Sequence, residues 1–279
     1  MPKKIFPNSF LGIEPEYSKY KTSKFIIIPV PHEVSTSYGK GTKNGPAAIL
    51  EASKQVETFD LELHQETYQK VGIFTHPNVK LSKLKATTYK VLKDKKIPII
   101  LGGEHSISSV AVNAAKARYP RLSVLQFDAH ADLRNEYEGN KNSHACAMRR
   151  VLEICPAVQV GIRNISEEEW KFAQESGQIN KIHLAQKLEE TEKIVTQLHD
   201  HVYITFDVDV LDPAIMPSTG TPEPGGLLWY EALDILREVI RLKRVVGMDF
   251  VELAPIKGLI APDFTVAKLI YRSIGYLSR

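Results

Sequence analysis

Short apolar segments alternate with amphipathic ones about eight times along the chain, and this alternation constrains the fold more than any other feature. The apolar segments are rich in Ile, Val and Phe, which is typical of buried strands. The longer segments between them have the spacing of helices. Strands that alternate with helices form a mostly parallel sheet with helices on both faces. We therefore predict the α/β class, as three αβα layers around about eight strands.

Several local signals refine this prediction. Pro46 suits the first turn of a helix, where its missing N–H costs nothing. Ser166 and Glu169 form the pattern of a capping box, and Ser106 is expected to cap the helix that follows it. We expect strands near residues 25–30, 71–74, 97–101, 122–127, 158–161, 182, 202–206 and 245–250. We expect helices over 46–57, 81–95, 107–118, 143–154, from 166, and over 189–199, 228–242 and 263–277.

The first 24 residues lack this periodicity, and we predict an N-terminal arm, residues 1–24, that runs over the surface. Residues 25–279 contain no linker, internal repeat or low-complexity tract. We therefore expect them to form a single domain.

Charge and cysteine content exclude several classes of function. The net charge is +3, and 25% of the residues are charged, so nucleic acid is not an expected partner. The two cysteines, Cys146 and Cys155, provide neither a disulfide framework nor a zinc pattern. The N-terminus lacks the apolar core of a signal peptide, and no apolar run reaches membrane-spanning length. We expect a cytoplasmic protein with no membrane partner.

Carboxylate and imidazole side chains follow three of the predicted strands. Asp128, His130 and Asp132 come directly after the strand at 122–127, at alternate positions that project to one side of an extended chain. His105 follows the strand at 97–101, and Asp207 and Asp209 follow the strand at 202–206. In a parallel sheet the ligand site lies beyond the carboxyl ends of the strands. We therefore expect these six side chains to converge.

Each of these segments has a structural alternative when it is taken alone. An acidic pair after a strand often caps a turn, and a single loop histidine is often simply hydrogen-bonded.

Four aspartates brought together without a cation would repel one another strongly. Six oxygen and nitrogen ligands without a thiolate suit Mn²⁺, with Zn²⁺ or Fe²⁺ as alternatives, and their number suits two ions about 3.5–4 Å apart.

Three segments in this order resemble the signature segments of the ureohydrolase family, which contains arginases and agmatinases. They are Gly102-Gly-Glu-His-Ser106, Asp128-Ala-His-Ala-Asp132 and Phe206-Asp-Val-Asp-Val-Leu-Asp-Pro213. Weaker resemblances occur at residues 41–46, 218–226 and 251–255, so the likeness spans roughly residues 25 to 275. The resemblance implies an arginase-like fold, two Mn²⁺ per subunit and a homo-oligomer, either a trimer or a hexamer.

The resemblance also implies roles for individual residues. Bound metal would activate water for attack on a guanidinium carbon, releasing urea and an amine. Glu252 would pair with the guanidinium through its carboxylate, and His144 would carry protons to the leaving amine. Thr221 would place a hydroxyl near the substrate. One ion would be held by His105, Asp128, Asp132 and Asp207, and the other by Asp128, His130, Asp207 and Asp209. Asp209 would also have a catalytic role.

The segment at 133–142 bears on the substrate. It does not resemble the arginase loop that binds the α-carboxylate of arginine, whereas residues 143–150 and 219–226 are similar to agmatinases. Glu136 or Glu138 could attract the ammonium of agmatine, or be ordinary solvated charges. The chain differs from residues common in the family at Glu104 and Ala131, and neither of these positions is a ligand. We therefore expect an agmatinase that converts agmatine to putrescine and urea, with an arginase or another guanidino-acid ureohydrolase as the alternative.

Two other functions compete with this interpretation. A metal-dependent deacetylase of related fold would use one ion and fewer ligands, so His105, Asp132 and Asp209 argue against it. A non-catalytic metal-binding relative would be favoured by the loss of His144 or Glu252, and both are present.

Overall fold

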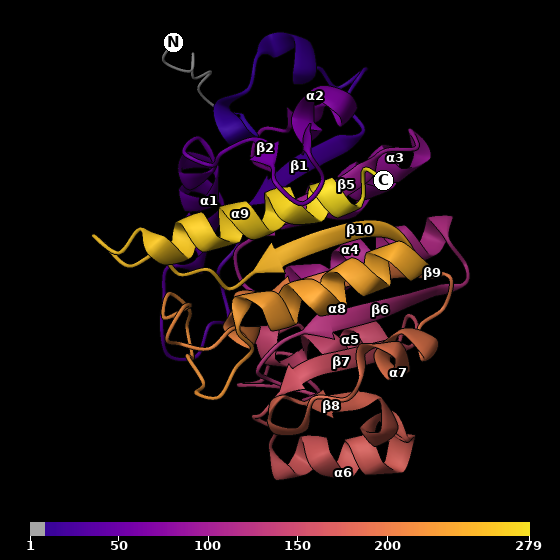
Figure 1. Cartoon of the computed structure of the whole chain (residues 1–279). Coiled ribbons are helices and arrows are strands. Elements are labelled where there is room, and N and C mark those ends of the chain that lie inside the picture. Colours follow the sequence, from indigo (N-terminus) through magenta and orange to yellow (C-terminus); the bar gives the residue numbers. More distant parts are fainter. Residues whose placement is uncertain (1–8) are drawn as a thin grey trace.

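Eight parallel strands form the central sheet of the computed structural model, which describes residues 9–279 (Figure 1). Their order is β4–β1–β5–β10–β9–β6–β7–β8, and every neighbouring pair is parallel. The predicted α/β sheet is therefore confirmed. The strands are β1 (Phe25–Val30), β4 (Ile73–Thr75), β5 (Ile97–Gly102), β6 (Leu122–Phe127), β7 (Ala157–Ile162), β8 (Ile182–Leu184), β9 (His201–Asp207) and β10 (Arg244–Val251).

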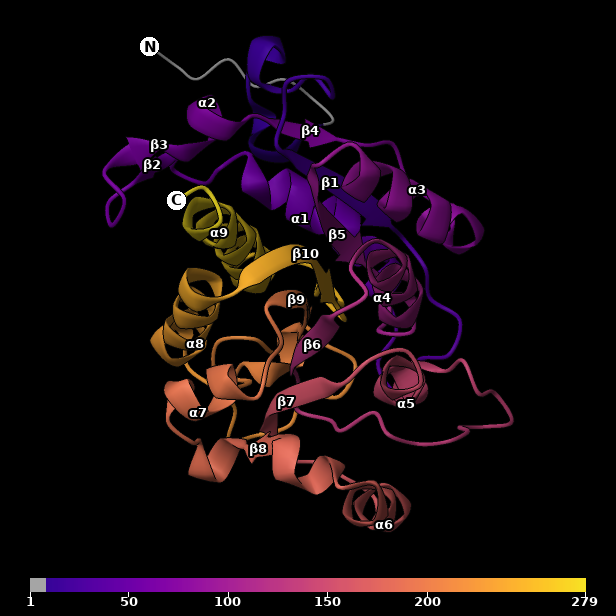
Figure 2. The same cartoon turned by 90° about the vertical axis from the view of Figure 1, so that its right-hand side faces the viewer.

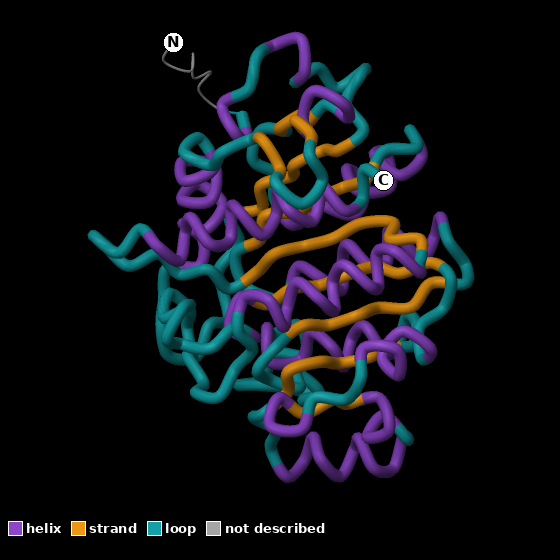
Figure 3. Tube along the Cα trace, viewed as in Figure 1, coloured by secondary structure: helices purple, strands orange, loops and turns teal. Residues whose placement is uncertain are grey.

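Helices cover both faces of this sheet, which gives the three predicted layers (Figures 2 and 3). One face carries α1, α7, α8 and α9, and the other carries α3, α4, α5 and α6. The helices are α1 (Gly45–Ser53), α2 (Thr67–Val71), α3 (Leu81–Lys93), α4 (Ile107–Arg118), α5 (Ala147–Leu152), α6 (Glu167–Ser176), α7 (Thr191–Thr196), α8 (Trp229–Leu242) and α9 (Ala261–Tyr276). None of these helices, within the part of the chain described, is long and apolar enough to cross a membrane.

Two hydrophobic cores lie on the two faces of the sheet. Successive side chains of a strand point to opposite faces, so Ile27 packs with α1 and α9, whereas Ile26 and Ile28 pack with α3 and α4. All three isoleucines are fully buried. Burial of each such side chain contributes about 1.5–3 kcal/mol, so both faces anchor the central strands firmly.

Two of the three predicted local signals are confirmed and one is wrong. Ser166 and Glu169 form the capping box of α6, and Pro46 lies in the first turn of α1. Ser106 does not cap α4, because its backbone is already helical whereas a capping residue is extended. Its hydroxyl instead donates to Oε1 of Glu104 at 2.6 Å.

The N-terminal segment and the second predicted strand also differ from expectation. Phe10, Leu11 and Ile13 are buried in the core, so the predicted surface arm is wrong for these apolar residues, which local periodicity did not reveal. Residues 1–8 of the arm lie outside the described part of the chain. Val71 ends α2, and the strand begins only at Ile73. A small antiparallel hairpin of β2 (Phe59–Asp60) and β3 (Gln65–Glu66) was not expected.

Candidate metal centre and active site

Four neighbouring strands at the middle of the sheet deliver the predicted site residues to one edge. In the order β5, β10, β9, β6, their carboxyl ends carry His105, Glu252, Asp207 and Asp128. Contact between the loops after β1 and β5 requires Gly103, because a Cβ there would lie 1.9 Å from the carbonyl oxygen of His32. Strand order therefore brings together residues that are far apart in the sequence.

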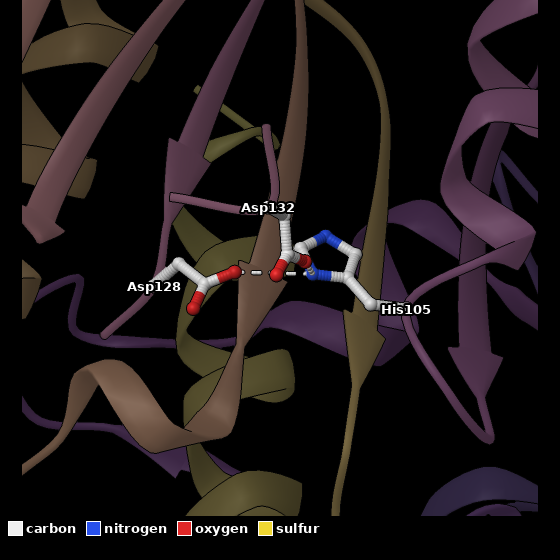
Figure 4. Close-up of side chains that lie close together, drawn as sticks. All are labelled: His105, Asp128 and Asp132. Atoms are coloured by element: carbon white, nitrogen blue, oxygen red, sulfur yellow. Dashed lines mark ion pairs between the residues drawn. The ribbon is translucent and has the colours of Figure 1, made fainter. Parts of the chain in front are cut away.

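The first ligand group consists of His105, Asp128 and Asp132, all buried (Figure 4). Nδ1 of His105 lies 3.1 Å from Oδ2 of Asp128 and 3.0 Å from Oδ2 of Asp132. The same nitrogen lies 3.5 Å from Oδ2 of Asp207. One imidazole nitrogen thus faces three carboxylates, which is the arrangement expected around a cation.

The second ligand group shares Asp128 with the first and adds His130 and Asp209. Nδ1 of His130 lies 2.9 Å from Oδ2 of Asp209 and 3.6 Å from Oδ1 of Asp128. Within each group the ligand atoms lie within 4.8 Å of one another. The structure therefore brings all six predicted ligands together, with Asp128 between two groups and Asp207 beside the first.

Crowding of buried acids shifts their proton affinities. Burial and the charge of Asp128 raise the pKa of Asp132 to about 7. Burial, then the charges of Asp209 and Asp128, raise the pKa of Asp207 well above its usual value. Burial lowers the pKa of His130, but the charges of Asp209 and Asp128 outweigh it and raise that pKa to about 12. Without a cation, protons must occupy this cluster, so the residues suit a doubly charged ion.

A hydrogen-bond chain behind His105 orients it as a ligand. Thr205 donates its hydroxyl proton to Asp249 at 2.6 Å, so its oxygen accepts from Nε2 of His105 at 2.9 Å. Nδ1, which faces the carboxylates, would then present its lone pair to a bound cation. Metal-bound histidines are oriented through their other ring nitrogen in this way. The donor set therefore fits the ions implied by the sequence.

His144 lies at the side of the cavity, held by hydroxyl groups. Its Nε2 is 3.0 Å from Oγ of Ser37, and its Nδ1 is 3.3 Å from Oγ of Ser35. Ser35 donates to Oε1 of Glu104 at 2.8 Å, which fixes the position of its oxygen. Burial lowers the pKa of His144, so the ring is neutral near pH 7 and can accept a proton.

Glu252 and Thr221 also line the cavity. Glu252 is buried, and its Oε1 accepts from the backbone N–H of His105 at 2.6 Å. Burial raises the pKa of Glu252 to about 8, so a cationic partner is needed to keep it ionised at neutral pH. Oγ1 of Thr221 lies 3.5 Å from Nε2 of His130. Both residues thus line the cavity, and the roles that the resemblance implies for them stay predictions.

The cavity above these groups has a volume of about 280 Å³ and opens between the loops after β1, β6 and β9. Tyr38, Tyr137 and Asn164 line it beside the predicted ligands. Glu136 and Glu138 are exposed and do not line it, so they are solvated loop charges. A small linear molecule can therefore reach the carboxylate cluster.

The sequence matches the arginase family over residues 23–274. The chain belongs to the arginase family. This arginase-family chain is 36% identical to the N(1)-aminopropylagmatine ureohydrolase of Synechocystis sp., over 97% of this chain and 94% of that relative. It is 32% identical to the agmatinase of Pyrococcus horikoshii, over 93% of this chain and 94% of that relative. The fold matches the agmatine ureohydrolase of Thermoplasma volcanium with a TM-score of 0.85 and 27% identity, over 99% and 95% of the two chains.

These similarities show a ureohydrolase, which excludes the deacetylase and non-catalytic alternatives. The groups that support the ligands of this arginase-family site were not predicted from the sequence. Ser35 and Ser37 follow β1 and could have been found by the rule that located the ligands. Thr205 and Asp249 lie inside strands, where no local signal separates them from structural residues.

Proposed function

We propose that this ureohydrolase cleaves a linear guanidino compound whose far end carries an amine, releasing urea and a polyamine. Two Mn²⁺ ions, held by the six ligands, would lower the pKa of a water molecule so that it attacks at neutral pH. The observation that carries the proposal is the convergence of those ligands beside Glu252 in one cavity.

The protein groups divide the remaining work. Glu252 pairs with the guanidinium, because a planar fork of N–H donors matches a carboxylate. His144 takes up a proton at a ring nitrogen and passes it to the departing amine. The hydroxyl of Thr221, which lies beside His130, forms a hydrogen bond with the substrate.

An amine end fits the cavity better than a carboxylate end. Among the described residues, Arg134 is the only arginine or lysine that lines it. Arg134 already faces a carboxylate and an aromatic ring, with its Nε 4.0 Å from Oε2 of Glu169 and its guanidinium 5.4 Å from the ring centre of Tyr137. The α-carboxylate of arginine would therefore have to compete with Glu169 for this one cation.

Two amine-ended substrates remain, and the relatives favour one of them. The relative that is 36% identical is an N(1)-aminopropylagmatine ureohydrolase, and agmatinases also match. We propose N(1)-aminopropylagmatine as the preferred substrate, with agmatine, the substrate expected from sequence, as the second candidate. Both contain the agmatine skeleton, and N(1)-aminopropylagmatine carries an additional aminopropyl group.

A panel of guanidino compounds tests this proposal. Urea release by the Mn²⁺-loaded enzyme is measured with N(1)-aminopropylagmatine, agmatine and arginine at equal concentrations. We expect kcat/KM to fall in that order, by about tenfold at each step, which corresponds to about 1.4 kcal/mol. A preference for arginine would refute the amine-end argument, and equal rates for the first two would refute the preference for the longer substrate.

A further inference from the structure

A second and larger cavity, the basic groove, lies at the opposite edge of the sheet and has a volume of about 830 Å³. Lys24 and Lys96 directly precede β1 and β5, and Arg244 begins β10. These three strands are neighbours in the sheet, so their amino ends meet. In Figure 1 this edge faces the C-terminus, away from the arrowheads of the strands.

Cations dominate the lining of the basic groove. Nine arginines and lysines line it, and Glu238 is the only acidic side chain among the described residues that do so. The nine are Lys24, Lys95, Lys96, Arg118, Arg237, Arg241, Lys243, Arg244 and Arg279.

Some of these cations have structural roles. Lys24 donates to the carbonyl of Leu277 at 3.0 Å, and Lys243 donates to that of Leu198 at 2.8 Å. Cations at such carbonyl-rich ends offset the partial negative charge of helix C-termini. Lys96 likewise donates to a carbonyl, and Arg237 and Arg241 pair with carboxylates. Five of the nine are therefore explained by the fold.

The other four have no such role. Within residues 9–279 the side chains of Lys95, Arg118, Arg244 and Arg279 make no hydrogen bond or ion pair. The guanidinium groups of Arg118 and Arg244 lie 5.4 and 5.7 Å from the ring centre of Tyr119. One aromatic ring thus holds two unpaired guanidinium groups at the groove, where their charges add.

The backbone of Lys95 has a conformation that is unusual for a residue other than glycine. It closes α3 with φ of 59°, a left-handed conformation that favours glycine. Its N–H bonds to the carbonyl of Leu92 at 3.1 Å, and the N–H of Lys96 bonds to that of Val91 at 3.1 Å. This end motif normally carries glycine, and a side chain there costs about 1–2 kcal/mol. The chain tolerates this strain at a position that adds a cation to the groove.

We propose that the basic groove binds a small polyanion that carries several phosphate or sulfate groups, a site separate from the ureohydrolase site. Guanidinium forks pair with the oxygens of such groups through two hydrogen bonds. The four unpaired cations surround an open space, so several anionic groups can be contacted at once. The cavity volume lies within the range of about 300–1,000 Å³ for small-molecule sites.

Isothermal titration calorimetry with sucrose octasulfate tests the proposal on the full-length Mn²⁺-loaded enzyme. Sulfate esters bind divalent metals weakly, so this probe leaves the metal centre intact. We expect the double variant Arg118→Glu/Arg244→Glu to bind at least about tenfold more weakly than the original protein. The affinity of the milder Arg118→Gln/Arg244→Gln variant for sucrose octasulfate is expected to lie between those of the original protein and the charge-reversed variant. Urea release should be unchanged in both variants.

A matched control separates a site from general charge. Lys85→Glu/Lys187→Glu changes the net charge equally at exposed positions outside the groove, and its affinity should stay within about twofold. Equal weakening of both charge-reversed proteins, or no binding by the original protein, would overturn the proposal. Binding of a single-stranded RNA oligonucleotide without binding of sucrose octasulfate would also overturn it, since the groove would then recognise an extended polymer.

Discussion

At the residue scale, two residues of the active site have a backbone conformation that is unfavourable for any residue other than glycine. Asp132 and Glu252 have φ of 52° and 65°. Left-handed conformations of residues other than glycine cost about 1–3 kcal/mol and persist where the surroundings enforce them. Both side chains are buried in the cavity, so packing and hydrogen bonds elsewhere offset this strain to aim the two carboxylates.

Asp128 belongs to both ligand groups, so its loss should affect both ions. We expect Asp128→Asn to remove most of the bound metal and to lower urea release by at least about a hundredfold. Plasma mass spectrometry measures the metal and a colorimetric assay the urea. The exposed Glu138→Gln is the control, and full activity of Asp128→Asn would contradict the shared-ligand role.

Thr205 orients His105 without touching the predicted ion. Thr205→Val keeps the shape but removes the acceptor of the Nε2 proton, so the ring loses its preferred tautomer. We expect metal affinity to fall about 10–100-fold, measured by chelator competition, with activity restored at high Mn²⁺. Thr205→Ser retains the hydroxyl and should restore affinity, and unchanged affinity in the valine variant would refute the orienting role.

His144 separates proton transfer from metal binding. We expect His144→Ala to retain both ions and lose about 10²–10⁴-fold in kcat, since general acid–base catalysis contributes about that much. Metal content and steady-state urea release are measured on the same preparation. Loss of metal in this variant would show a structural role instead.

At the scale of secondary structure, the start of α6 links stability to the active site. Glu169 accepts from the N–H of Ser166 at 2.8 Å and, with its other oxygen, from the N–H of Leu133 at 2.8 Å. Glu169 also lines the active-site cavity. The capping box therefore fastens the loop after Asp132 as well as the helix.

Ser166→Ala removes the capping hydroxyl of α6. We expect the free energy of unfolding to fall by about 1 kcal/mol, a typical value for the loss of a capping residue. Urea-induced unfolding followed by circular dichroism measures the change. Ser176→Ala, near the other end of α6, is the control and should change it less.

At the scale of the whole molecule, the two edges of the sheet carry opposite charge. Acidic ligands gather at the carboxyl ends of the strands, and unpaired cations gather at the amino ends. The sheet order decides both clusters, because each is built from neighbouring strands. The homo-oligomer implied by resemblance stays a prediction, which multi-angle light scattering would test.

The metal-free protein should lose stability as the pH rises. Asp132 and Glu252 have pKa values of about 7 and 8, above the values of about 4 in unfolded chains, so the folded state holds more protons between these limits. The raised pKa of His130, about 12 against an ordinary 6.5, acts in the same direction. The stabilisation from these protons is complete below the pKa values of the unfolded chain. It is lost as the pH rises through the pKa values of the folded state.

We therefore expect the Tm of the chelated protein to fall by about 5 °C or more between pH 6 and pH 8.5. With Mn²⁺ bound, the cations replace these protons, so the Tm should fall less over the same range. Differential scanning calorimetry measures both states. A rise in Tm with pH for the metal-free protein would contradict the proton-filled cluster.

The sequence by itself indicated the main alternation of strands and helices, the edge of the sheet at which acidic and imidazole side chains gather, and the candidate ligands among them. Periodicity and residue type are local features of the sequence, so they can be recognised without knowledge of the fold. Only the tertiary structure decided that Phe10 is buried, that Ser35 holds His144, and that Thr205 orients His105 from 100 positions away. These contacts depend on which strands are neighbours and how loops cross the sheet edge, and no local pattern encodes either.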